Sequence, residues 1–172
     1  MQKMVLEIFQ GEIEKQCKFA IIAVEQIKTG LANNNSDLVW YAIQNILVAV
    51  ANISKFFWTQ SPMSQKRGEE LRKSLGIKND SLIRSRKFRN YFEHFDEGLE
   101  TWATSSERHN FIDSNIGPLN MIAGIDQQDF LRNFDPTTWT LTFRGDKYEL
   151  KPIIEFIYDL YPKVSTEANK PF

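Results

Sequence analysis

The amino-acid sequence predicts a mainly α-helical protein: an antiparallel bundle of four to five helices with a small C-terminal β-hairpin appendage. Three observations predict this fold class. Apolar residues recur every three or four positions in two long segments near the N-terminus, which is the spacing of one face of an α-helix. Two further helical segments follow after short connections, as in an antiparallel bundle. Near the C-terminus the spacing changes to strict alternation, which is typical of strands.

The first helix is expected from about residue 3 to residue 31, and the second from about residue 36 to residue 57. Gly30 and the asparagines at 33–35 should end the first helix, and Asn35 or Ser36 can cap the second. The predicted buried face of the first helix consists of Phe9, Ile13, Cys17, Ala20, Val24, Ile27 and Leu31. That of the second consists of Val39, Ile43, Ile46, Val50, Ile53 and Phe57.

A shorter third helix and a long fourth helix should complete the bundle. The third begins after the break at 61–62, carries Leu71 and Leu75 on a narrow apolar stripe, and is closed by Gly76. The fourth is expected from about 79–81 to residue 106. Its predicted apolar face consists of Phe88, Phe92, Phe95, Leu99 and Trp102.

The remainder of the chain predicts a loop, a hairpin and a last helix. Residues 110–136 read as a loop with one strand near 120–125, and residues 139–150 alternate as in a β-hairpin that turns at Gly145. Pro152 can open a final helix that stops at Pro162, and the tail after Val164 is expected to be loose. The predicted organisation is therefore a helical bundle over 1–109, a loop and hairpin appendage over 110–150, and a C-terminal helix packing on the bundle with a short tail over 151–172.

The composition excludes several classes of protein. The chain has 172 residues, 42% hydrophobic and 25% charged, which is typical of a globular domain. With 21 basic and 22 acidic residues, the net charge of -1 argues against an overall basic nucleic-acid binder but not against a local basic patch. The single cysteine, Cys17, and the two histidines make a structural zinc site unexpected. Without a signal peptide or an apolar run long enough for a membrane span, we expect a cytoplasmic protein.

The candidate catalytic residues lie in the segment 84–97. On a helical wheel with Phe88 at zero, Arg89 lies at about 100°, Asn90 at about 200° and His94 at about 240°. These three side chains share the polar arc that faces away from the predicted core. Histidine transfers protons near neutral pH, and arginine offers two parallel donors to a phosphate. Together they suit cleavage of an RNA phosphodiester without a metal or cofactor.

The motif resembles that of a known family. The sequence Arg89-Asn90-Tyr91-Phe92-Glu93-His94 matches the arginine, polar residue, three variable positions and histidine of HEPN domains. These are helical bundles found in many prokaryotic toxins and defence ribonucleases, and the resemblance covers roughly residues 1–109. It implies a homodimer in which two copies of the motif helix form one composite cleft. His94 would then be the general acid–base group, Arg89 the phosphate ligand and Asn90 the residue that orients the cleft.

One position departs from part of that family. HEPN toxins paired with a nucleotidyltransferase antitoxin often carry a tyrosine two residues after the histidine, where this chain has Asp96. Regulation by modification of that tyrosine is therefore not expected. An uncontrolled ribonuclease would harm its own cell, so a regulatory or antitoxin protein that silences it remains a hypothesis. Some HEPN domains lack activity, which leaves a non-catalytic nucleotide- or protein-binding module as the alternative, and an unrelated helical adaptor as a third.

Basic residues are concentrated in the segment just before the motif. Residues 66–89 contain nine basic and three acidic side chains, and Arg84, Arg86 and Lys87 are the predicted substrate-binding residues. An RNA backbone requires such a local excess, although an ordinary solvated helix face accounts for it equally well. His109, at the expected end of the fourth helix, is interpreted as a capping or surface residue. The resemblance thus implies RNA and a second copy of the chain as partners.

Overall fold

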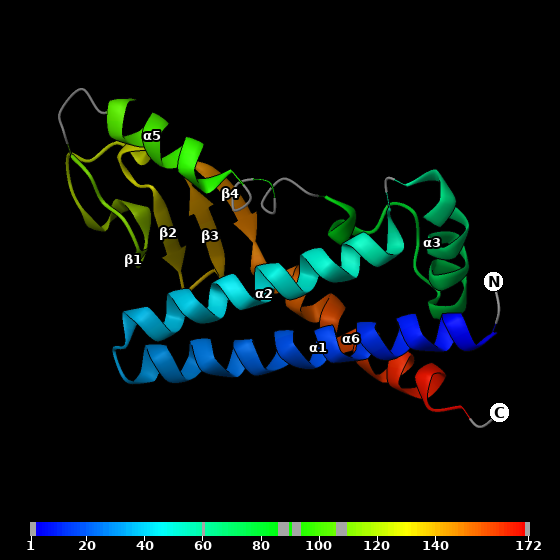
Figure 1. Cartoon of the computed structure of the whole chain (residues 1–172). Helices are drawn as coiled ribbons and strands as arrows, with labels where there is room; N and C mark the ends of the chain where they lie inside the picture. The colour runs from blue at the N-terminus through cyan, green and yellow to red at the C-terminus, as the bar shows by residue number, and fades with distance from the viewer. Residues whose placement is uncertain (1–2, 60, 86–89, 91–93, 106–109, 171–172) are drawn as a thin grey trace. The chain divides into compact units, whose positions relative to one another are not determined.

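The computed structural model describes residues 3–59, 61–85, 90, 94–105 and 110–170 (Figure 1). The chain is mainly helical with a small four-stranded sheet. It divides into two compact units. We call residues 1–86 and 153–172 the helical unit, and residues 87–152 the sheet unit.

Two long helices form the centre of the helical unit. α1 (Lys3–Ala32) and α2 (Ser36–Phe57) lie side by side and antiparallel (Figure 1). Asn35 caps α2, since its side chain accepts a hydrogen bond of 3.0 Å from the backbone N–H of Leu38. All six apolar residues predicted for the second helix are buried, and so are the five predicted for the first between Ile13 and Ile27. Phe9 and Leu31, at the two ends of the first predicted face, are half-buried. Both helices are confirmed, and so are the face of the second helix and the central part of the face of the first.

Gly30 acts differently from the prediction. It lies inside α1, which continues to Ala32, and it is buried. A Cβ atom at this position would lie 2.7 Å from Cγ2 of Val39 on α2. Gly30 is therefore required because the two helices approach closely here, rather than because the first helix ends.

Shorter helices complete the helical unit. α3 (Pro62–Leu75) buries Leu71 and Leu75 and ends at Gly76, as predicted. η1 (Leu82–Arg84) contacts α2 and buries Ile83. α6 (Leu150–Ala168) lies against α1, because the ammonium group of Lys18 lies 5.9 Å from the centre of the Tyr161 ring.

α2 is also the one helix in the described part of the chain that is long and apolar enough to cross a membrane. Half of the apolar window that meets this criterion is buried inside the structure. The core helix of a soluble protein has the same properties, so the finding is weak evidence for a membrane span.

The described residues of the sheet unit include an α-helix and the four strands of one sheet. These are α5 (Phe95–Ser105), β1 (Asn115–Ile116), β2 (Arg132–Asp135), β3 (Thr140–Phe143) and β4 (Asp146–Glu149). The strand order is β1-β2-β3-β4, with β1 parallel to β2 and the other pairs antiparallel. The predicted hairpin is confirmed as β3–β4. Arg144 and Gly145 both have positive φ, 46° and 85°, as the two-residue turn of a tight hairpin requires.

The two faces of this sheet differ in chemistry. α5 packs on one face, where the rings of Phe95 and Phe143 lie 6.3 Å apart and Trp102 Nε1 donates a 2.9 Å hydrogen bond to the carbonyl of Asp129. Because side chains alternate along a strand, the pairing of Asn133 with Thr142 and of Asp135 with Thr140 places these polar residues on the opposite face.

Four predictions are wrong or differ from the structure. The segment expected as one helix from about 79 to 106 begins instead with η1 and an extended Ser85, and α5 starts at Phe95. Residues 119–121 form η2 (Leu119–Met121) and no strand lies at 120–125. The last helix continues past Pro162 to Ala168. The predicted boundary at residue 109 also differs, since α5 groups with the sheet.

Candidate functional site

The structure describes part of the predicted catalytic motif. Asn90 and His94 lie within the described residues, and both are exposed. Arg89, Arg86 and Lys87 lie outside them, as do the predicted core residues Phe88 and Phe92 and the second histidine, His109. The site is therefore built from Asn90, His94 and their neighbours.

Asn90 and His94 are joined by helical backbone geometry. The N–H of His94 donates a 3.0 Å hydrogen bond to the carbonyl of Asn90, and the N–H of Gly98 donates a 3.1 Å bond to the carbonyl of His94. Both bonds connect residues four apart, which is the pattern of an α-helix. Asn90 and His94 are thus connected by a helix-like backbone hydrogen bond, and both side chains are exposed, as the helical wheel predicts.

The imidazole of His94 is exposed and lies close to an acidic side chain. Its side chain is 63% exposed, and Nδ1 lies 3.5 Å from Oε1 of Glu97. A protonated imidazole would form an exposed ion pair with this carboxylate, which contributes little to stability.

Arg84, the one predicted substrate-binding residue that the structure describes, lines a cavity of about 430 Å³ in the helical unit. Its Nη1 donates a 3.1 Å hydrogen bond to the carbonyl of Asn79. A second arginine, Arg72, also lines the cavity; its guanidinium donates to the carbonyl of Phe57 and lies 5.6 Å from the centre of the Trp58 ring. Glu69 lines the same cavity, so its lining combines two guanidinium groups, which favour an anionic ligand, with one carboxylate, which opposes it.

Not every residue of the predicted basic patch is available to a ligand. The guanidinium of Arg67 lies 4.4 Å from the centre of the Phe9 ring, and its Nε is buried. Arg67 therefore packs α3 against α1. The local charge excess in the sequence thus combines side chains that pack the helical unit with side chains such as Arg84 that are exposed.

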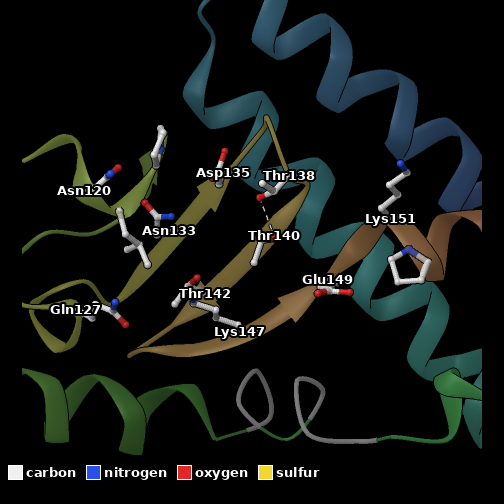
Figure 2. Close-up of a pocket in the computed structure, with 13 residues that line it drawn as sticks. Asn120, Gln127, Asn133, Asp135, Thr138, Thr140, Thr142, Lys147, Glu149 and Lys151 are labelled. Atoms are coloured by element: carbon white, nitrogen blue, oxygen red, sulfur yellow. Dashed lines mark hydrogen bonds between the residues drawn. The ribbon is translucent and has the colours of Figure 1, made fainter.

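A second cavity, of about 620 Å³, lies on the polar face of the sheet unit (Figure 2). This cavity was not predicted from the sequence, although polar and apolar residues alternate along β3 and over the last three residues of β2. The polar side chains that line it are Asn120, Gln127, Asn133, Asp135, Thr138, Thr140, Thr142, Lys147, Glu149 and Lys151. Hydrogen bonds from the side chain and backbone of Thr137 and from Thr138 hold the pKa of Asp135 below its usual value.

An ion pair joins Asp113, just before β1, to Arg132 at the start of β2. Arg132 donates from Nε to Oδ1 of Asp113 at 2.8 Å and from its terminal nitrogen to the other oxygen. Burial alone would raise the pKa of Asp113, but hydrogen bonds and charge from Arg132, with hydrogen bonds from Ser114, outweigh burial and lower it. The same guanidinium lies 5.1 Å from the centre of the Phe95 ring, so it also contacts the start of α5.

Among the described residues, no three histidine, cysteine or acidic side chains cluster as a metal site would require. The chain matches no protein-family model. Comparisons with curated proteins and with solved structures find no match. The candidate site therefore rests on its residues and their geometry.

Proposed function

We propose that the protein is a metal-independent endoribonuclease of HEPN type that acts as a homodimer in a defence or toxin setting. The observation that carries the proposal is the exposure of Asn90 and His94, which a backbone hydrogen bond connects, in a motif that resembles that of HEPN ribonucleases. The proposal includes the finer fold assignment, in which the helices correspond to a HEPN-like bundle of four to five helices.

The proposed reaction is an internal transesterification. The ribose 2′-oxygen forms a bond to the adjacent phosphorus while its proton passes to a general base. The bond between phosphorus and the 5′-oxygen breaks, and that oxygen takes a proton. The products are a 2′,3′-cyclic phosphate and a free 5′-hydroxyl, so atoms and charge balance without a further reactant.

Each motif residue has a chemical role in this proposal. His94 transfers the proton, because imidazole can accept and return a proton near neutral pH. Arg89 stabilises the charge that develops on the phosphate oxygens. Asn90 orients the cleft, and Arg84, Arg86 and Lys87 bind the RNA backbone through charge. Two copies of the motif in a homodimer would supply these groups in duplicate.

The test compares RNA cleavage by the wild type, His94→Ala and Arg89→Ala in the presence of EDTA. His109→Ala is the matched control, because it removes the other histidine of the chain. Loss of a general acid–base group typically costs about 10²–10⁴-fold in rate, so we expect that loss in His94→Ala and an unchanged rate in His109→Ala. Light scattering in parallel shows whether each variant keeps the mass of the wild type.

Two results would contradict the proposal. The first is RNA that stays intact with the wild type, with or without EDTA, whether the RNA is structured or single-stranded. RNA that is bound but never cut would favour a non-catalytic binding module. The second is a His94→Ala variant that cuts as fast as the wild type.

A further inference from the structure

We propose that the polar face of the sheet unit binds a sugar ring, through the vicinal hydroxyl groups of a neutral carbohydrate. The site is the cavity of about 620 Å³ over β2, β3 and β4 (Figure 2), a volume within the range of small-molecule sites. It lies on the sheet face opposite α5, so this binding is separate from the proposed cleavage at His94 and does not depend on it.

The cavity contains a buried amide group that lacks a partner. Asn133 is 1% exposed, and its Oδ1 accepts a 2.5 Å hydrogen bond from Nδ2 of Asn115. Its own Nδ2 is buried and finds no hydrogen-bond partner among the described residues. In Figure 2 this nitrogen points from β2 toward β3, along the cavity side of the sheet. Because buried polar groups in native proteins are almost always paired, an acceptor atom from a ligand would complete it.

Hydroxyl groups surround this amide. Thr142, directly opposite Asn133 on β3, is 2% exposed, and Thr140 lies two residues away on the same strand face. Oγ1 of Thr138 donates to Oγ1 of Thr140 at 2.9 Å. Each threonine hydroxyl can donate and accept, so this surface offers donors and acceptors in alternation. The hydroxyl groups of a sugar have the same double capacity.

The charges on the lining favour a neutral ligand. Lys147 and Lys151 contribute two positive charges, and Asp135 and Glu149 two negative charges. The two carboxylates would repel an anionic ligand, and the two lysines would repel a cationic one. A neutral polyol can instead accept from the ammonium groups and donate to the carboxylates, as charge-assisted hydrogen bonds.

The apolar part of the lining is small and aliphatic. It consists of Pro118, Leu119 and Pro152, which can contact the C–H face of a sugar ring. No aromatic side chain lines the cavity within the described part of the chain, so nothing there stacks on a nucleobase. The sugar is therefore the group that is recognised, whether free or as part of a nucleoside.

The experiment is an NMR titration of the full-length, ¹⁵N-labelled protein. The probes are D-ribose, D-glucose, maltose and adenosine, with inorganic phosphate at matched ionic strength as the anionic comparison. We expect saturable shifts of the Asn133 side-chain amide and of the backbone amides of β3, with a dissociation constant on the order of 1 mM for at least one sugar. Adenosine binding more tightly than ribose would identify a nucleoside; the reverse order would identify a free sugar.

Variants of the lining separate binding from folding. Asn133→Leu keeps the approximate volume and removes the amide, and Thr142→Val and Thr140→Val remove one hydroxyl each. We expect binding about two- to tenfold weaker in Asn133→Leu, the range that follows from losing one hydrogen bond. Thr104→Val is the matched control, because Thr104 is exposed on α5 and bonds only to its own helix. If a substitution at Asn133 prevents folding, Thr140→Val still provides the test, because Thr140 is only half-buried.

Three outcomes would overturn the proposal. The first is that no sugar or nucleoside shifts these amides saturably at concentrations up to about 50 mM, which is well above the expected dissociation constant. The second is that phosphate shifts these amides more strongly than any sugar does. The third is that the lining variants that fold bind the sugar as well as the wild type does.

Discussion

Cys17 lies on the buried face of α1, and no part of it is exposed. Burial, with a smaller contribution from the charge of Glu14, raises the pKa of its thiol to about 12. The thiolate is the reactive form, so the folded protein should protect this cysteine in two ways. Reaction requires the helical unit to open, and the thiol is protonated until it does.

Thiol labelling therefore reports opening of the helical unit. With Ellman's reagent at pH 8, we expect Cys17 to react at least about 100-fold more slowly in the native protein than in urea, because opening a core site costs several kcal/mol. A native rate close to the rate in urea would contradict the packing of α1 against α2.

Asp113 and Arg132 make the sheet unit sensitive to acid. The pKa of Asp113 is lowered in the folded state, so its contribution to stability is complete above its unfolded pKa of about 3.9 and is lost as the pH falls through the folded value. We expect unfolding monitored by tryptophan fluorescence to show a smaller loss of stability between about pH 5 and pH 2 in Asp113→Asn than in the wild type. Asp113→Asn should be less stable at pH 7. If the stabilities of the wild type and Asp113→Asn fell in parallel with pH, the ion pair of Asp113 with Arg132 would contribute nothing to the acid sensitivity.

The exposure of some side chains could be predicted from the sequence. The helical wheel predicts Asn90 and His94 as exposed, and both are. It also predicts Leu99 as core, but Leu99 is 40% exposed. The wheel assumes one long bundle helix, whereas α5 is an 11-residue helix that packs on a sheet through Phe95 and Trp102. Which residues a helix buries depends on its partner, and periodicity does not identify that partner.

At the scale of elements, the α1–α2 pair allows a controlled test of close helix packing. Gly30→Ala places a Cβ atom 2.7 Å from Val39, and should destabilise the protein by about 1–3 kcal/mol because the helices must separate. Gly11 lies in the same helix with nothing within 4 Å of an added Cβ. Gly11→Ala should therefore stabilise the protein by about 0.5–1 kcal/mol.

Urea unfolding of the two variants measures both effects on one helix. Equal shifts in the same direction would mean that helix propensity, not the approach to Val39, determines the result at Gly30. The close approach itself could not be predicted from sequence, because a glycine near a helix end is more often a terminator.

The long helices could be predicted from the sequence, and the ends of other elements could not. A proline inside a helix removes one hydrogen bond, which favours ending α6 at Pro162. The helix continues because Val164 beyond it is fully buried and Ser165 hydrogen-bonds Glu14 on α1. The oxygen of Pro162 also accepts a 2.9 Å bond from Thr166. Tertiary contacts distant in sequence outweigh the local signal.

At the scale of the whole molecule, the chain forms two compact units, the helical unit and the sheet unit. The balanced charge of -1 excludes binding of RNA through an overall basic surface. If the proposed function is correct, RNA is bound by local groups of basic residues, and Arg84 and Arg72 beside one cavity are such a group. The sequence could not predict either cavity, because each is formed by residues from several elements.

The proposed function also predicts an assembly. We expect light scattering to give about twice the chain mass of 20.1 kDa at micromolar concentration. His94→Ala should keep this mass, because it removes an exposed side chain rather than a core contact. A wild type that cleaves RNA as a monomer at every concentration would contradict the composite site.

The most direct test of ribonuclease activity uses one RNA oligonucleotide and its 2′-deoxy counterpart, both incubated with the wild type in EDTA, with the product ends determined by mass spectrometry. Attack by the ribose hydroxyl predicts that the RNA is cut to fragments ending in a 2′,3′-cyclic phosphate and that the deoxy strand stays intact. Cleavage of both strands, or of neither, would contradict the account.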